Sequence, residues 1–224
     1  VGLFAKLLSR HYTPGGEKEK FGPKYLDPRA IESPPLAFGN AQREFMRMAD
    51  IVKGLGDVRP PMTPEVRVLL SLSKPVIAAV NGVAIGSGMD LAMACDIIVA
   101  SDTARFGQGY VRMGLMADVL GYWRGPQRVG ASRAAQLLMT GEIIDAPTAE
   151  RYGLVSEVVA ADGLMDRVGA LAAKIAGNPP LAVRHIKEGL RRGVGQPASA
   201  LPELATYVGN GLARLFASHD HAEA

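Results

Sequence analysis

A single carboxylate beside a run of glycines marks the stretch of the chain that is best suited to catalysis. Residues 74–96 read KPVIAAVNGVAIGSGMDLAMACD. The apolar residues 76–80 predict a buried strand, and residues 87–95 have the composition of a helix. The glycines between them permit tight bends and the close approach of a ligand. Free amides at the start of such a helix, aided by the helix dipole, can stabilise an oxyanion, and Asp90 lies one turn further along.

Four segments, in this order along the chain, resemble the crotonase superfamily, which is also called the enoyl-CoA hydratase/isomerase family. They read KPVIAAVNGVAIGSGMDLAMACD at 74–96, DIIVASDTARFGQ at 96–108, MGLMADVLG at 113–121 and TGEIIDAPTAERYGLVSEVV at 140–159. The resemblance covers roughly two-thirds of the chain. It implies an α/β fold with a crotonase-like ββα spiral core, and an acyl-CoA thioester as the substrate. It also implies a C-terminal helical region that joins subunits into a homotrimer or a dimer of trimers.

The chain is expected to have three parts. Residues 1–73 form an irregular N-terminal segment with a mobile loop and an amphipathic helix, residues 74–160 the crotonase-like core, and residues 161–224 the helical C-terminal region. The family's opening strands, and the upstream motif that supplies a second oxyanion donor, are not found in the sequence. Since the first residue is Val1, we expect either an alternative start codon or a fragment of a longer product.

The composition indicates one packed core, because 48% of the 224 residues are hydrophobic and 21% are charged. The net charge of +3 is too small to indicate a nucleic-acid partner. We expect no membrane contact, because no apolar run approaches a bilayer span and the opening residues lack the cationic start and apolar core of a signal peptide. Cys95 is the only cysteine, which excludes an intrachain disulfide and favours the cytoplasm. The histidines lack metal-ligand spacing, so no metal is expected, and no cofactor besides the CoA of the substrate.

The resemblance assigns the backbone amide of Ser87 as one oxyanion-hole donor, although its side chain could simply cap the helix. It also assigns the residues around the glycine turn, Ala84, Ile85, Gly86 and Gly88, to substrate binding. Proton transfer next to a thioester carbonyl passes through an enolate, which requires such donors together with a positioned acid or base.

Two acidic positions of the family are altered in this chain. Family hydratases place two glutamates around the substrate, and these positions here hold Asp90 and, in FGQGYV, Tyr110. A tyrosine with a pKa near ~10 donates a proton but is a poor base at neutral pH. Dienoyl-CoA isomerases, a subgroup, carry aspartate at the first position and another aspartate in a segment that here reads GLMAD and contains Asp118.

The leading hypothesis is therefore an acyl-CoA isomerase in which Asp90 and Asp118 relay a proton while the Ser87 amide holds the thioester oxygen. An enoyl-CoA hydratase is the alternative, and C–C hydrolysis of a cyclic β-diketone is a third. A degenerate paralogue that binds CoA or forms oligomers is the non-catalytic alternative. Simpler structural roles also stay open, since Asp90 could pair with the helix dipole, Asp118 could be an N-cap, and Tyr110 could be a pocket wall.

The last third of the chain is predicted to be mainly helical. Asp145 followed by Pro147 indicates the start of a helix, and Gly153 its end before a strand at 154–159. Apolar residues at helical spacing then predict three helices, with apolar faces that run through 164–175, 180–190 and 201–215.

Overall fold

A parallel sheet of three short strands lies under one long helix in this computed structural model, which describes residues 64–218. The strand order is β1 (Ile77–Val80), β3 (Ile97–Ser101) and β6 (Glu157–Val159). Apolar residues fill β1 and β3 because both faces of the sheet are covered. The buried strand predicted at 76–80 is confirmed, whereas the strand predicted at 154–159 is shorter, since it pairs with β3 only from Glu157 onward.

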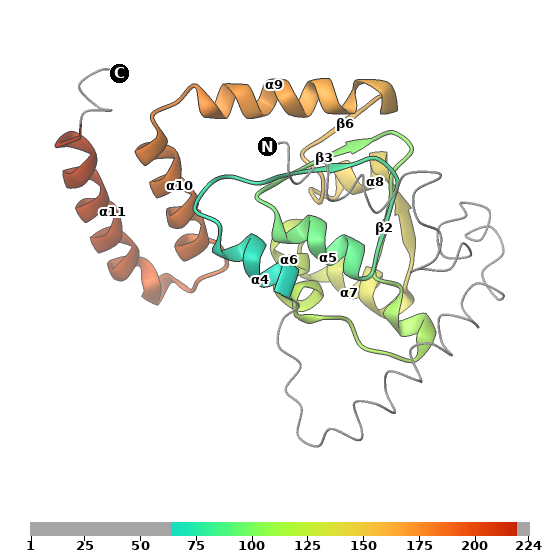
Figure 1. Ribbon diagram of the computed structural model, residues 1–224. Coiled ribbons are helices and arrows are strands. Elements are labelled where there is room, and N and C mark those ends of the chain that lie inside the picture. The colour runs from blue at the N-terminus through green and yellow to red at the C-terminus, as the bar shows by residue number, and fades with distance from the viewer. Residues whose placement is uncertain (1–63, 219–224) are drawn as a thin grey trace.

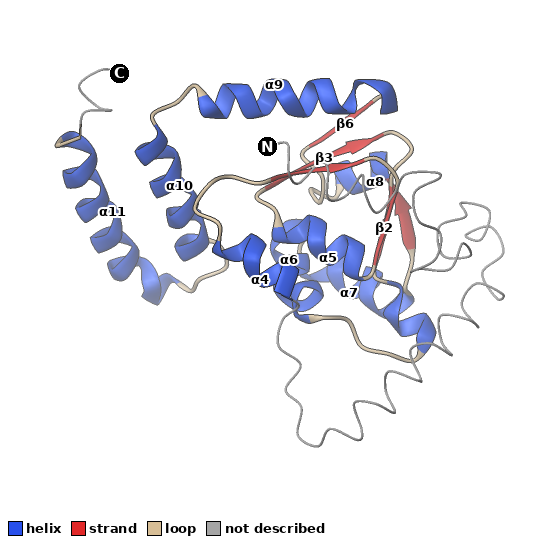
Figure 2. Ribbon diagram, in the orientation of Figure 1, coloured by secondary structure: helices blue, strands red, loops and turns tan. Residues whose placement is uncertain are grey.

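A second sheet consists of β2 (Val83–Ile85), β4 (Arg105–Gly107) and β5 (Ile143–Asp145) (Figure 2). β2 pairs with β4 in parallel, and β5 pairs with β4 in the antiparallel direction. The assignment of residues 83–85 to the glycine-rich turn between the strand and the helix is wrong. These residues form a strand because they pair with a segment about twenty residues away, and local sequence carries no signal of that pairing.

Helices surround both sheets, and within residues 64–218 three short 3-10 helices lie in the connections between elements. The α-helices are α4 (Pro64–Ser71), α5 (Ser87–Ala94), α6 (Val119–Val129), α7 (Ala131–Thr140), α8 (Ala146–Arg151), α9 (Leu164–Ala176), α10 (Pro180–Gly193) and α11 (Leu201–Phe216). The 3-10 helices are η2 (Gly109–Met113), η3 (Ala161–Gly163) and η4 (Ala198–Ala200). The predicted helices in the last third are thus confirmed, and Asp145 is the N-cap of α8.

The main core lies between the sheets and the helices α5 to α8. Its largest fully buried members include Phe106 of β4, Met93 of α5 and Leu120 of α6. Cys95 belongs to this core, and burial raises the pKa of its thiol to about 12. Cys95 is the C-cap of α5 and is buried there as a free thiol.

The C-terminal helices are attached to the core in two ways (Figure 1). α9 lies across the parallel sheet and buries Leu164 and Val168 against it. α10 and α11 lie side by side at one flank of the molecule, and the ammonium group of Lys187 in α10 holds them there. Lys187 Nζ donates to Asp96 Oδ2 and to the carbonyl of Lys74, both at 2.7 Å, and its side chain is 5% exposed.

None of the helices in residues 64–218 combines the length and the apolar character needed to cross a bilayer. Within the same residues, no group of histidine, cysteine and carboxylate side chains is arranged to bind a metal ion. The predictions of a mobile loop, of an amphipathic helix and of absent opening strands fall on residues 1–63, which lie outside the described residues.

Candidate active site

The glycine turn predicted to begin the site is fixed by Gly86. Its φ of 55° and ψ of −122° fall in a region that side-chain-bearing residues rarely adopt. Its N–H donates to the carbonyl of Gly107 at 2.9 Å, and its carbonyl accepts from Asp90 N at 3.0 Å as the first bond of α5. The amides of Ser87, Gly88 and Met89 precede that bond and have no acceptor within the helix.

Strand pairing carries a second segment to the start of this helix. Because β2 and β4 run in parallel with Ile85 opposite Gly107, the residues that follow the two strands emerge side by side. After β2 the chain enters α5, and after β4 it enters η2, which contains Tyr110. A Cβ at Gly86 would lie only 3.3 Å from Tyr110 Cζ, so the small size of Gly86 also admits the tyrosine ring.

Asp90 is the centre of a hydrogen-bonded network at this junction. Its side chain is 2% exposed, and it is the only buried carboxylate among the described residues. Tyr110 donates its hydroxyl proton to Asp90 Oδ2 at 3.0 Å, and Gln108 Nε2 donates to Oδ1 at 2.9 Å. The Tyr110 hydroxyl is also 3.2 Å from Ser87 Oγ. The structure therefore joins three of the predicted site residues, Ser87, Asp90 and Tyr110, by hydrogen bonds.

Burial dominates the electrostatics of the network. It raises the pKa of Asp90, an effect that the hydrogen bonds from Gln108 and Tyr110 partly offset and that the negative charge of Asp118 reinforces. Burial likewise raises the pKa of Tyr110. The Ser87 hydrogen bond opposes this effect, and the negative charge of Asp90 adds to it. Tyr110 therefore stays protonated at neutral pH. Burial increases the proton affinity of the carboxylate, and a neutral phenol lies next to it. Such a pair is suited to proton transfer.

Asp118, the other predicted acid, is not part of this hydrogen-bonded network. It is the N-cap of α6, and its carboxylate accepts from the N–H of Val119 at 2.6 Å. The capping role left open in the sequence analysis is thus observed. Asp118 is half-buried and lies close enough to raise the pKa values of both Asp90 and Tyr110. Its effect on Asp90 in the structure is electrostatic.

The predicted substrate-binding residues surround the same turn but differ in their constraints. Ala84 is buried and pairs with Phe106 in the second sheet, while Ile85 is half-buried at the end of β2. Gly88 has no other heavy atom within 4 Å of the position of a Cβ, so space alone does not require glycine there. We expect both Gly86 and Gly88 to bind substrate, but the backbone conformation requires glycine only at position 86.

Gln108 was not among the predicted site residues, although it donates to Asp90 as Tyr110 does. It is 2% exposed and its Nε2 holds Asp90 Oδ1, while its Oε1 is buried without a hydrogen-bond partner among the described residues. A signal was present, because a glutamine directly after the apolar end of a strand is an unusual residue to bury. Its partner could not be identified without the pairing of β2 and β4.

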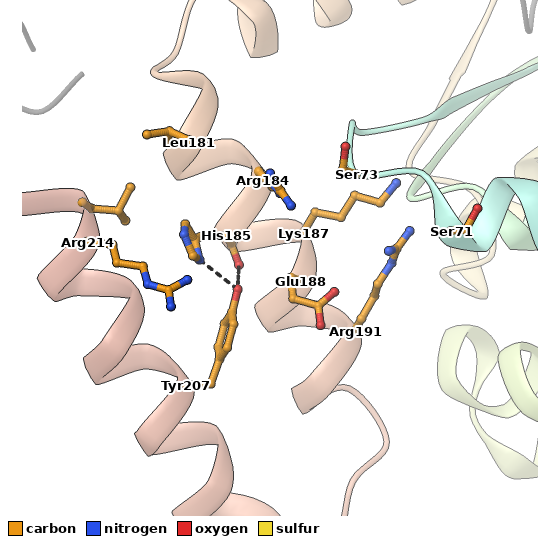
Figure 3. A pocket seen from close by; sticks show the side chains of 11 residues that line it. Ser71, Ser73, Leu181, Arg184, His185, Lys187, Glu188, Arg191, Tyr207 and Arg214 are labelled. Carbon is orange, nitrogen blue, oxygen red and sulfur yellow. Dashed lines mark hydrogen bonds between the residues drawn. The ribbon is translucent and has the colours of Figure 1, made fainter. Parts of the chain in front are cut away.

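A cavity of about 510 Å³ lies elsewhere in residues 64–218 (Figure 3). It opens between α10, α11 and the segment after α4. Four cationic side chains line it with one carboxylate, namely Arg184, Lys187, Arg191, Arg214 and Glu188. Tyr207 donates to the carbonyl of His185 at 3.1 Å in its wall. None of the predicted site residues lies there, so the network at Asp90 is the better candidate for the chemistry.

Comparison with known proteins agrees with the fold. A profile described as enoyl-CoA hydratase/isomerase matches residues 36–208, which is more than half of the chain. The 2,3-dehydroadipyl-CoA hydratase of Escherichia coli K12 is 39% identical over 147 residues, which cover 66% of this chain and 56% of that protein. The short-chain-enoyl-CoA hydratase of Clostridium acetobutylicum is 45% identical over 128 residues, covering 57% of this chain and 49% of that protein.

The fold matches solved structures as well. An enoyl-CoA hydratase subunit I from Geobacillus kaustophilus superimposes with a TM-score of 0.68 at 36% identity, covering 77% of this chain and 68% of that one. The chain belongs to the enoyl-CoA hydratase/isomerase family, the crotonase superfamily, and has its α/β fold. It spans about half the length of the sequence relatives that it matches, 56% of one and 49% of another.

Proposed function

We propose that this protein moves a double bond within an unsaturated acyl-CoA by transferring a proton through a thioester enolate. The amide of Ser87, at the start of α5, would hold the thioester oxygen while negative charge develops on it. The proton removed from one carbon would be stored at Asp90 and returned to another carbon. Asp118, whose charge already influences Asp90, is the second acid of the proposed relay.

The observation that carries this proposal is the set of partners of Asp90. Hydration in this family is expected to use two carboxylates to hold and activate a water molecule. Here both oxygens of Asp90 accept from neutral donors, Gln108 and Tyr110, and Asp118 accepts from the start of α6 instead. A neutral phenol is a poor base for water, whereas an internal proton transfer needs only one group that can take up and release a proton.

Hydration of an enoyl-CoA is the second candidate, and the names of the relatives favour it. The similar proteins of Escherichia coli and Clostridium acetobutylicum are both named as hydratases. In that case Asp90 would have to orient water together with Tyr110 or Asp118.

The test is to incubate the full 224-residue chain with a 3,5-dienoyl-CoA and, separately, with a 2-enoyl-CoA. Ultraviolet absorbance follows conjugation and mass spectrometry follows the addition of water. We expect a shift of conjugation without a change of mass on the dienoyl substrate. A gain of one water on the enoyl substrate would support the hydratase instead, and inactivity on both would support a protein that only binds CoA thioesters.

A designed variant sharpens this choice. Tyr110→Glu places a second carboxylate beside Asp90, which should create measurable hydration of a 2-enoyl-CoA where the wild-type protein has little. Tyr110→Gln is the matched control because it has nearly the same shape without the charge. Hydration that is equal in the wild-type protein and in Tyr110→Glu would contradict the proposal that Tyr110 disfavours water activation.

We also propose a homotrimer or a dimer of trimers. The support is a set of exposed apolar side chains on α10 and α11, Ile186, Leu190, Leu201, Leu212 and Phe216. Light scattering coupled to size-exclusion chromatography would measure the mass, and a monomer at micromolar concentration would contradict this assembly.

A further inference from the structure

The buried carboxylate of Asp90 is linked to the open side of the site through two hydroxyl groups. Asp90 is 2% exposed, Tyr110 is 8% exposed, and Ser87 is exposed. The Tyr110 hydroxyl lies 3.0 Å from Asp90 Oδ2 and 3.2 Å from Ser87 Oγ. The three side chains therefore form one hydrogen-bonded series that begins at the buried carboxylate. It ends at Ser87, whose backbone amide has no acceptor within α5.

We propose that Tyr110 carries the proton between Asp90 and the bound thioester, and that the Ser87 hydroxyl holds the Tyr110 hydroxyl in position for this transfer. The inference rests on the proposed function, because it requires a thioester oxygen at the Ser87 amide. Tyr110 is then a catalytic residue. The side chain of Ser87 is a positioning residue, with a role separate from that of its own amide.

The proton count of each hydroxyl sets the direction of the hydrogen bonds. When Asp90 is ionised, Tyr110 donates its only proton to Oδ2, so the bond to Ser87 requires the serine to donate. When Asp90 is neutral, it donates to Tyr110 Oη, and the tyrosine proton is released to point at the ligand. Gln108 holds Oδ1 at 2.9 Å in the structure, so the carboxylate can change its charge without rotating.

Transfer through this series balances without a co-reactant. The C–H bond next to the thioester carbonyl breaks, and its electron pair forms the enolate. Its proton passes to Tyr110 Oη while the former tyrosine proton passes to Asp90 Oδ2. The reverse transfer returns a proton to carbon and regenerates the carboxylate. Tyr110 is neutral before and after each transfer, in agreement with the burial that raises its pKa.

The placement of Ser87 explains why the phenol would meet the reacting carbon. A thioester oxygen at the Ser87 amide places the carbonyl carbon and its neighbour at the start of α5. The Ser87 hydroxyl, 3.2 Å from Tyr110 Oη, keeps the phenol at the same end of the helix. Direct contact between Asp90 and the substrate is disfavoured because the carboxylate is buried behind Tyr110 and Gln108.

The test measures exchange of the α-protons of butyryl-CoA in D₂O by nuclear magnetic resonance and mass spectrometry, using the full 224-residue chain. This saturated thioester has no double bond to move or to hydrate, so exchange reports proton transfer alone. The variants are Tyr110→Phe, Asp90→Asn, Ser87→Ala and Ser87→Thr. Tyr122→Phe is the matched control, since Tyr122 is 49% exposed in α6. Circular dichroism and thermal unfolding establish that each variant is folded.

We expect Tyr110→Phe and Asp90→Asn each to lower the exchange rate about 100-fold or more. The double variant should be no slower than the slower single variant, because the two groups act as a unit. Ser87→Ala should lower the rate and Ser87→Thr, which keeps the hydroxyl, should restore it. Tyr122→Phe should exchange like the wild-type protein.

Three results would overturn the inference. The first is an exchange rate of folded Tyr110→Phe within about twofold of wild type while Asp90→Asn is inactive. The second is an exchange rate of Ser87→Ala equal to that of wild type. The third is the absence of exchange by the wild-type protein. The first shows direct action of Asp90, and the second removes the positioning role of Ser87. Failure of the proposed function alone is recognised differently. Wild-type protein would exchange the α-protons of butyryl-CoA, with the predicted losses in the variants, but would leave a 3,5-dienoyl-CoA unchanged.

Discussion

Replacing Gly86 by alanine should damage both the stability of the protein and its candidate active site. The backbone at this position has a φ of 55° and a ψ of −122°, and a Cβ there would lie 3.3 Å from Tyr110 Cζ. Strain of this kind costs about 1–3 kcal/mol. Displacing the Tyr110 hydroxyl from the buried carboxylate of Asp90 costs about 1.5–3 kcal/mol. We therefore expect Gly86→Ala to lower the free energy of unfolding by about 2.5–6 kcal/mol.

Gly88→Ala is the matched control, two residues further along the chain. A Cβ at Gly88 meets no other heavy atom within 4 Å, and the residue is in α5. Alanine is favoured over glycine in a helix by about 0.5–1 kcal/mol, so this variant should be as stable as wild type or slightly more stable. The assay is urea unfolding followed by circular dichroism, combined with the α-proton exchange of butyryl-CoA.

The two variants should differ in stability and in exchange. Gly86→Ala should unfold at a lower urea concentration, while the slope of its free energy of unfolding against urea stays unchanged. Its rate of α-proton exchange should fall because Tyr110 moves away from Asp90. If the free energies of unfolding of the two variants agree within about 0.5 kcal/mol, the contact at Gly86 and its backbone strain are not as described.

Three further predictions concern stability and reactivity. Lys187→Met should lower the free energy of unfolding, measured in urea, by about 1–3 kcal/mol. This loss is smaller than for a fully buried ion pair because Asp96 is partly exposed. Lys174→Met, at an exposed position, should have little effect. Burial raises the pKa of Asp90, so the folded protein binds this proton more tightly than the unfolded chain does. The contribution of Asp90 to stability should therefore be largest below about pH 4 and fall as the pH rises, and unfolding of Asp90→Asn across pH should lack that slope. Burial raises the pKa of Cys95 to about 12, so a thiol reagent at pH 8 should label it slowly until urea unfolds the chain; rapid labelling of folded protein would contradict its burial.

Much of the local architecture could be predicted from neighbouring residues. Asp145 before Pro147 identifies the N-cap of α8, and its carboxylate accepts from Thr148 N at 2.9 Å as expected of a cap. Gly153 ends the segment after α8 with a φ of 82°. The spacing of Ser87 and Asp90 within one helical turn likewise follows from the sequence. Each of these features depends on contacts within about four residues, which the order of residues specifies directly.

The resemblance to the family identified the positions of Asp90 and Tyr110 but not their interaction. Tyr110 reaches Asp90 because β2 and β4 pair with Ile85 opposite Gly107, and the sequence analysis had no strand at β2. The role of Gln108 was missed for the same reason. Asp118 shows the opposite case, since its capping of α6 is a local feature that its sequence context already suggested.

The sequence by itself thus determined the family, the glycine turn, the helix that begins at Ser87 and the caps of later helices. Only the tertiary structure decided which groups surround Asp90 and how the C-terminal helices are held. Lys187 contacts the carbonyl of Lys74 across 113 positions of the chain, and Tyr110 contacts Asp90 across 20. The physical reason is that turns and caps are set by hydrogen bonds between near neighbours. Contacts between distant segments depend on strand pairing and on the packing of the whole core.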